Sequence, residues 1–178
     1  MDQGKFKKEL LEWIKVFVSA IVLAFIIQLF VSPTIVRGQS MYPTLDNNNY
    51  LLINKTAYMS NSPKMGDIIV FKSDLETENG KHKDLVKRVI GVAGDEITVT
   101  GGLVYVNREP ISEDYISGAY TDGELDTIVP DGCVFVMGDN RGNSLDSRSQ
   151  QVGFVSVRDD VIGRVFIRLF PFNNITFF

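Results

Sequence analysis

Hydrophobic positions are distributed so unevenly that the chain divides into two parts. Val16 to Val31 form an uncharged run of 16 residues. As a helix rising ~1.5 Å per residue the run is ~24 Å long, slightly short of a ~30 Å hydrocarbon core. Apolar residues at positions 10, 11, 13 and 14 extend it if the amine of Lys15 reaches the lipid headgroups. The pattern predicts a membrane anchor over residues 16–32.

The charges beside this run predict its orientation. Lysines precede it at positions 5, 7, 8 and 15, whereas only Arg37 follows it closely. Cytoplasmic flanks carry the excess of positive charge. Residues 1–15 are therefore expected in the cytoplasm and residues 33–178 outside a cell membrane that the chain crosses once.

Two other interpretations of the run fit its residues less well. A cleaved signal peptide would end in small residues, but this run ends in the bulky Leu29, Phe30 and Val31. A buried core helix would usually carry a polar stripe, and the run offers only Ser19 and Gln28. A retained anchor is the interpretation that the sequence favours.

Beyond the run, short apolar segments separated by Gly, Pro, Asn and Asp predict strands. Gly101-Gly102 between two alternating segments is typical of a β-hairpin. The charged residues 74–84 are expected to form a loop, and the acidic residues 109–126 a surface excursion. The pattern predicts one mostly antiparallel β domain, as a barrel or packed sheets. The expected strands are 34–37, 50–54, 67–72, 85–91, 96–100, 103–107, 133–137 and 162–170.

Composition limits the chemistry that this domain can perform. The 178 residues include 18 Lys+Arg and 22 Asp+Glu, and the net charge of −4 disfavours nucleic-acid binding by bulk charge. A single Cys133 excludes an intramolecular disulfide and a Cys-rich zinc site, and a single His82 excludes a multi-histidine metal site. No metal-ligand cluster or phosphate-binding glycine loop is present, so we expect no cofactor. Hydroxyls, carboxylates, Lys and Arg remain as reactive groups.

Ser40 is a candidate nucleophile because Gly38 and Pro43 constrain the turn around it. An ordinary turn serine remains an alternative on this segment alone. A serine hydroxyl needs a base to become nucleophilic. His82 lies in a hydrophilic stretch typical of a solvated histidine, and Cys133 is expected to be a buried free thiol.

Lys87 is the candidate base. A catalytic lysine must be neutral, and burial among apolar groups can lower its pKa by up to ~3–5 units. Strand alternation places Lys87 on one face with Leu85 and Val89, while Arg88 faces the other way. A lysine that protects an edge strand from aggregation remains the alternative.

A third polar segment follows the expected strand 133–137. Residues 138–148 contain alternating charges and many hydrogen-bonding groups. The spacing of a calcium loop fails because Gly142 comes too early and no Glu closes the loop. A long turn with Asx-type bonds and a shell of Asp–Arg pairs that fixes a neighbouring strand both stay open.

These segments together resemble bacterial type I signal peptidases, the membrane-bound serine endopeptidases that remove signal peptides from exported proteins. The resemblance runs from the anchor to about Phe172, and the single span and short length are similar to the Gram-positive forms. The blocks that carry it are Ser40-Met41-Tyr42-Pro43-Thr44-Leu45, Gly66-Asp67-Ile68-Ile69-Val70-Phe71, Lys87-Arg88-Val89-Ile90-Gly91 through Gly94-Asp95, and Gly138-Asp139-Asn140-Arg141 with Ser144, Asp146, Ser147 and Arg148.

The resemblance implies an antiparallel β-barrel-like catalytic domain and a Ser–Lys dyad of Ser40 and Lys87. Ser40 would attack the scissile carbonyl and its backbone N–H would form part of the oxyanion hole. Ser144 would hydrogen-bond and orient the lysine. Substrates would be preprotein signal peptides with small residues at the first and third positions before the cut, processed by a monomer at the bilayer. Residues implied to hold the shape of the site are Asp139, Asp146, Arg88 and Arg148, and those implied to contact substrate are Met41 and Pro43.

The chain departs from the family pattern at three places. Gly38 replaces a serine that completes the oxyanion hole in some members. Leu85 occupies a position that is often aromatic, although it still shields Lys87 from water. The segment before Cys133 is short, which implies that the large accessory domain of some relatives is absent.

Two rival functions remain for such a sequence. A self-cleaving Ser/Lys peptidase of the repressor type would share the fold, but those proteins are soluble. A catalytically silent, membrane-tethered binding module would not need Ser40, Lys87 and Ser144 intact. Cleavage of a separate preprotein distinguishes both rivals from a signal peptidase.

Overall fold

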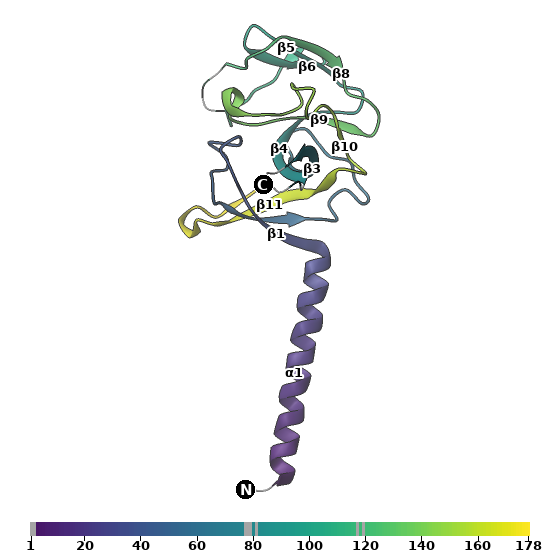
Figure 1. The fold of residues 1–178 in the computed structure, drawn as a ribbon, viewed down its shortest axis with the longest axis vertical. Helices are drawn as coiled ribbons and strands as arrows, with labels where there is room; N and C mark the ends of the chain where they lie inside the picture. Colours follow the sequence, from purple (N-terminus) through teal and green to yellow (C-terminus); the bar gives the residue numbers. More distant parts are fainter. Residues whose placement is uncertain (1–2, 77–79, 81, 117, 119) are drawn as a thin grey trace.

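The computed structural model describes residues 3–76, 80, 82–116, 118 and 120–178. It begins with helix α1 (Gln3–Phe30), which projects from the β domain as a long isolated rod (Figure 1). Lys8 to Phe30 are long and apolar enough to cross a membrane, with a mean hydropathy of 2.3 and none of the segment buried in the protein.

The helix ends two residues before the predicted end of the anchor. Val31 and Ser32, expected in the membrane span, instead begin strand β1 (Val31–Ile35). The reason is local, because Pro33 disfavours the helical conformation for the residue before it. The expected strand 34–37 is shifted toward the N-terminus for the same reason.

The remaining elements form two antiparallel sheets, which confirms the predicted fold class. The larger sheet has the strand order β1-β2-β11-β3-β4-β9-β10, with β12 paired to β11, and the smaller has the order β7-β6-β5-β8. The strands of the larger sheet are β2 (Tyr50–Asn54), β3 (Ile68–Glu76), β4 (His82–Val92), β9 (Cys133–Met137), β10 (Val155–Ser156), β11 (Val161–Phe170) and β12 (Thr176–Phe177). Those of the smaller sheet are β5 (Glu96–Thr100), β6 (Leu103–Val106), β7 (Glu109–Pro110) and β8 (Leu125–Ile128), and two short 3-10 helices are η1 (Arg141–Asn143) and η2 (Phe172–Asn174).

The segment expected as a charged loop at 74–84 is largely an extension of two strands. Strand β3 continues to Glu76 and β4 starts at His82, and these two residues are paired. Most of the side chains in this extension are exposed. Apolar alternation arises only where one face of a strand is buried, so the sequence pattern did not reveal these paired residues.

Strand β4 lies between β3 and β9 and carries the alternation that the sequence predicts. Leu85, Lys87 and Val89 are buried, whereas Val86 and Arg88 are partly exposed. Leu85 and Val89 pack with Phe71 and Val136 in one hydrophobic cluster. The lysine is therefore held on the core-facing side of a central strand.

Candidate active site

Ser40 and Lys87 are brought together from two separate elements. The Nζ atom of Lys87, on β4, lies 2.6 Å from the Oγ atom of Ser40, in the turn after β1. The same Nζ donates a hydrogen bond to the carbonyl of Val86 at 3.1 Å. When the lysine is neutral, its lone pair can accept the hydroxyl proton of the serine across this contact.

Burial changes the acidity of the lysine. Lys87 is 2% exposed, and desolvation lowers its pKa from 10.5 to about 8. The carboxylate of Asp146 acts in the opposite direction, Lys83 lowers the pKa further, and Asp139 raises it. Since desolvation dominates, a substantial fraction of Lys87 is neutral at mildly alkaline pH.

The pair lies in an open cleft of about 480 Å³. Strand β1 and the turn after it form one wall, and residues 82–87 of β4 form the opposite wall. Met41, a predicted substrate-binding residue, lines the cleft while its side chain reaches into the core. Pro43, the second predicted substrate-binding residue, is exposed and does not line the cleft.

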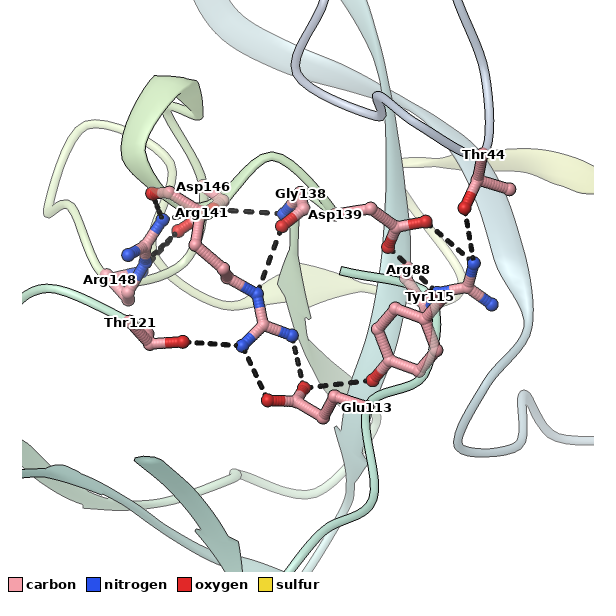
Figure 2. Close-up of polar contacts among 10 residues, drawn as sticks. All are labelled: Thr44, Arg88, Glu113, Tyr115, Thr121, Gly138, Asp139, Arg141, Asp146 and Arg148. Carbon is pink, nitrogen blue, oxygen red and sulfur yellow. Dashed lines mark hydrogen bonds and ion pairs between the residues drawn. The ribbon is translucent and has the colours of Figure 1, made fainter. Parts of the chain in front are cut away.

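Two aspartates whose charges act on Lys87 are each paired with an arginine, as Figure 2 shows. Arg88 binds Asp139 through Nε at 2.9 Å and Nη2 at 2.7 Å. Arg148 binds Asp146 through Nε at 2.8 Å and Nη2 at 2.9 Å. Both carboxylates are fully buried, so bidentate pairing compensates their loss of hydration. These are the four residues that the resemblance implies hold the shape of the site, and the structure joins them in two ion pairs.

The loop after β9 holds the backbone around Ser40 through hydrogen bonds. Asn140 donates its backbone N–H to the carbonyl of Ser40 at 3.0 Å and its side-chain amide to the carbonyl of Gln39 at 3.0 Å. Gly138 donates its N–H to Asp146 at 3.0 Å. The loop thus joins one carboxylate pair to the turn that carries Ser40.

Ser144 lies in this loop but does not contact the lysine by a hydrogen bond. Its Oγ atom is buried and has no hydrogen-bond partner in the part of the chain that the structure describes. It lies instead beside Gly138, where an added Cβ would overlap both Ser144 and the carbonyl of Ser40. The predicted bond from Ser144 to Lys87 is therefore not formed in this structure.

The segment expected as a surface excursion contributes side chains that sequence analysis missed. Glu113 forms a nearly buried ion pair with Arg141, and Thr121 accepts a hydrogen bond from Arg141 at 2.8 Å. Tyr115 lies under the guanidinium of Arg88, 4.0 Å from the ring centre. The pairs are separated by 20 to 28 residues in sequence, and an acidic segment without apolar periodicity gives no signal of such contacts.

Three other residues singled out from the sequence lie outside the dyad. His82 is exposed, and its Nδ1 atom lies 3.2 Å from the carbonyl of Ser73. Cys133 is a partly buried free thiol. Gly38 has a positive φ of 97° and donates its N–H to Asn47 at 3.0 Å. A side chain at position 38 would be strained in that conformation.

Several known proteins are similar to this chain in sequence. The family model "Signal peptidase, peptidase S26" matches residues 10–170. A probable signal peptidase I-2 from Synechocystis sp. is 41% identical over 165 residues, covering 90% of this chain and 73% of that protein. A signal peptidase I from Bacillus caldolyticus is 39% identical over 176 residues, covering 90% of this chain and 91% of that protein. A crystal structure of a signal peptidase I from Enterococcus faecalis V583 is 31% identical, with a TM-score of 0.47, and covers 58% of this chain and 97% of that one. The chain belongs to the signal peptidase family, peptidase S26.

Proposed function

We propose that Ser40 is the nucleophile and Lys87 the general base with which this type I signal peptidase removes signal peptides from preproteins. The observation that carries the proposal is the 2.6 Å contact between Ser40 Oγ and the Nζ of a 2% exposed lysine. A buried amine beside a hydroxyl is the arrangement that activates a serine without histidine. The predicted alternatives for both residues, a turn serine and an edge-strand lysine, do not require that contact.

The reaction follows from this geometry in two steps. Ser40 Oγ bonds to the scissile carbonyl carbon while its proton passes to Lys87 Nζ. The carbon–nitrogen bond then breaks, and Lys87 returns the proton to the leaving amine. A water molecule attacks the resulting ester and gives its proton to Lys87, which protonates Ser40 Oγ as the acid is released. The backbone N–H of Ser40 is the proposed donor to the developing oxyanion.

The cleft suits an extended peptide. Strand β1 is an edge of the larger sheet and is paired on one side by β2. A substrate strand can add to such an edge through main-chain hydrogen bonds. The aliphatic side chains of Val36, Met41 and Val70 line the space beside Ser40 and favour small side chains near the cut. One chain supplies all these groups, so we expect the monomer to be active.

Activity should rise with pH as Lys87 loses its proton. Burial holds the pKa of Lys87 at about 8, so about one tenth of the amine is neutral at pH 7 and about one hundredth at pH 6. We expect kcat/KM for a purified preprotein to fall about tenfold per unit below this pKa. The measurement is a pH profile of cleavage in detergent, with the cut site identified by mass spectrometry. A profile that stays flat down to pH 5 would contradict the role of Lys87.

We propose that α1 anchors the protein with the N-terminus in the cytoplasm and the β domain outside. The lysines at positions 5, 7, 8 and 15 support this orientation. Phe172 and Phe177 are 78% and 75% exposed, and exposed aromatic side chains of a tethered protein can insert into the lipid interface. Protease added to sealed right-side-out vesicles should remove the β domain. Digestion only after the vesicles are lysed would support the opposite orientation.

A further inference from the structure

The loop between β7 and β8 contacts Arg88, Arg141 and Arg148, and Figure 2 shows its side chains beside the first two. Tyr115 stacks under Arg88 at 4.0 Å, and Glu113 pairs with Arg141. The carbonyl of Asp122 accepts a hydrogen bond from Arg148 at 3.3 Å. The loop therefore contacts the supporting arginines, while none of its described residues lines the cleft.

Glu113 and Tyr115 act as one unit within this loop. The hydroxyl of Tyr115 donates to Glu113 Oε1 at 2.9 Å. Burial, followed by the negative charge of Glu113, raises the pKa of this hydroxyl above its usual value, so Tyr115 stays a donor at all working pH values. Arg141 has a side chain only 2% exposed, and a buried cation of this kind needs a charged partner. Glu113 supplies it.

Arg141 and Arg88, the two arginines in contact with Glu113 and Tyr115, both bind residues 138–139 in the loop after β9. Arg141 Nε donates to the carbonyl of Gly138 at 3.1 Å, and Arg88 binds the carboxylate of Asp139. The following residue, Asn140, donates to the carbonyls of Ser40 and Gln39. A continuous set of contacts thus runs from the β7–β8 loop to the backbone of Ser40.

We propose that Glu113 and Tyr115 are positioning residues that, through Arg141 and Arg88, hold residues 138–140 against the turn that carries Ser40. The proposal rests on the proposed role of Ser40 and Lys87. Gly138 leaves no space for a side chain between itself and Ser40, so a shift of this segment moves the nucleophile relative to Lys87. Displacements of about 1 Å at a reacting group can cost on the order of 100-fold in rate.

The test is the kinetics of Glu113→Gln, which removes the charge and keeps the size of the side chain. We expect kcat to fall at least about tenfold while KM stays within about threefold, because the loop does not line the cleft. The matched control is Asp114→Asn, which also replaces a carboxylate by an amide but at the exposed neighbouring position. It should leave kcat and KM unchanged. Circular dichroism should show that each variant is folded at the assay temperature.

A double-mutant cycle separates positioning from a general loss of structure. If Glu113 acts through Arg141, Glu113→Gln should lower kcat no further in an Arg141→Gln background. Additive losses, or wild-type kcat in Glu113→Gln, would overturn the proposal without affecting the dyad, which Ser40→Ala tests separately. If Glu113→Gln does not fold, the kcat values of two Tyr115 variants test the proposal instead. Tyr115→Phe keeps the ring under Arg88 and should retain more kcat than Tyr115→Leu, and equal values would overturn the proposal.

Discussion

Ser40→Ala is expected to reduce preprotein cleavage at least about 1000-fold, since the nucleophile of a covalent mechanism has no substitute. Among the described residues, Ser40 is the hydroxyl that forms a hydrogen bond with Lys87 Nζ, at 2.6 Å, whereas the buried Ser144 lies beside Gly138. The measurement is initial-rate cleavage of a purified preprotein by the detergent-solubilised full chain. Ser60→Ala, at an exposed position between β2 and β3, is the control and should cleave normally.

Lys87→Ala is expected to cause a loss of the same size, because the hydroxyl of Ser40 then has no base within reach. The described residues around Ser40 offer no histidine in its place, since His82 is exposed and contacts Ser73. The variant also removes a buried amine and leaves the carboxylates of Asp139 and Asp146 paired with their arginines, so we expect the fold to be retained. Lys72→Ala on the neighbouring strand β3 is the control, as Lys72 is exposed.

The losses of activity caused by the two substitutions should not add in the double variant. If Ser40 and Lys87 act as a unit, the double variant should be no slower than either single variant. Near-normal turnover in either single variant, with the fold intact by circular dichroism, would remove the basis for the dyad. Activity that survives only in Lys87→Ala would point to another base for Ser40.

Lys87 could be selected from the sequence because the relevant information is local. Alternation over Leu85, Lys87 and Val89 indicates which face of a strand is buried, and the structure confirms that face. The anchor is equally local, since it depends on an uninterrupted apolar run. The helix ends at Phe30, two residues before the predicted end of the anchor, because Pro33 disfavours the helical conformation for the residue before it.

The contacts of the β7–β8 loop could not be predicted in this way. Glu113 meets Arg141 across 28 residues, and an acidic side chain in a polar segment is ordinarily solvated. Only the folded arrangement of the two sheets brings the loop to the arginines. The same limit applies to Ser144, whose position beside Gly138 depends on how closely two backbone segments approach.

The carboxylates near Lys87 illustrate why such distant contacts matter. Asp146 and Asp139 raise the pKa of Lys87 and oppose its desolvation. Each is bound by an arginine, which offsets part of that negative charge at the lysine. The lowered pKa of Lys87 therefore depends on ion pairs whose members, except Arg88, lie far from the lysine in sequence.

Gly138→Ala is expected to be the most damaging substitution outside the dyad. The new Cβ would overlap Ser144 Oγ and the carbonyl oxygen of Ser40. Ser144 is a side chain that can rotate, but the carbonyl belongs to the backbone of the nucleophile and accepts a hydrogen bond from Asn140. Relief of the clash with the carbonyl requires the backbone at Gly138 or Ser40 to shift, and a shift that changes the position of Ser40 relative to Lys87 should lower kcat on the order of 100-fold.

Overpacking of this kind should also cost about 1–3 kcal/mol of unfolding free energy, measured by urea denaturation of the solubilised protein. Gly142→Ala is a matched control in the same loop, because no described residue other than its chain neighbours has a heavy atom within 4 Å of an added Cβ there. It should keep wild-type kcat and stability. Wild-type kcat in Gly138→Ala would show that Ser40 does not depend on the loop packed against it. A loss of stability with kcat preserved in the folded fraction would limit the role of Gly138 to folding.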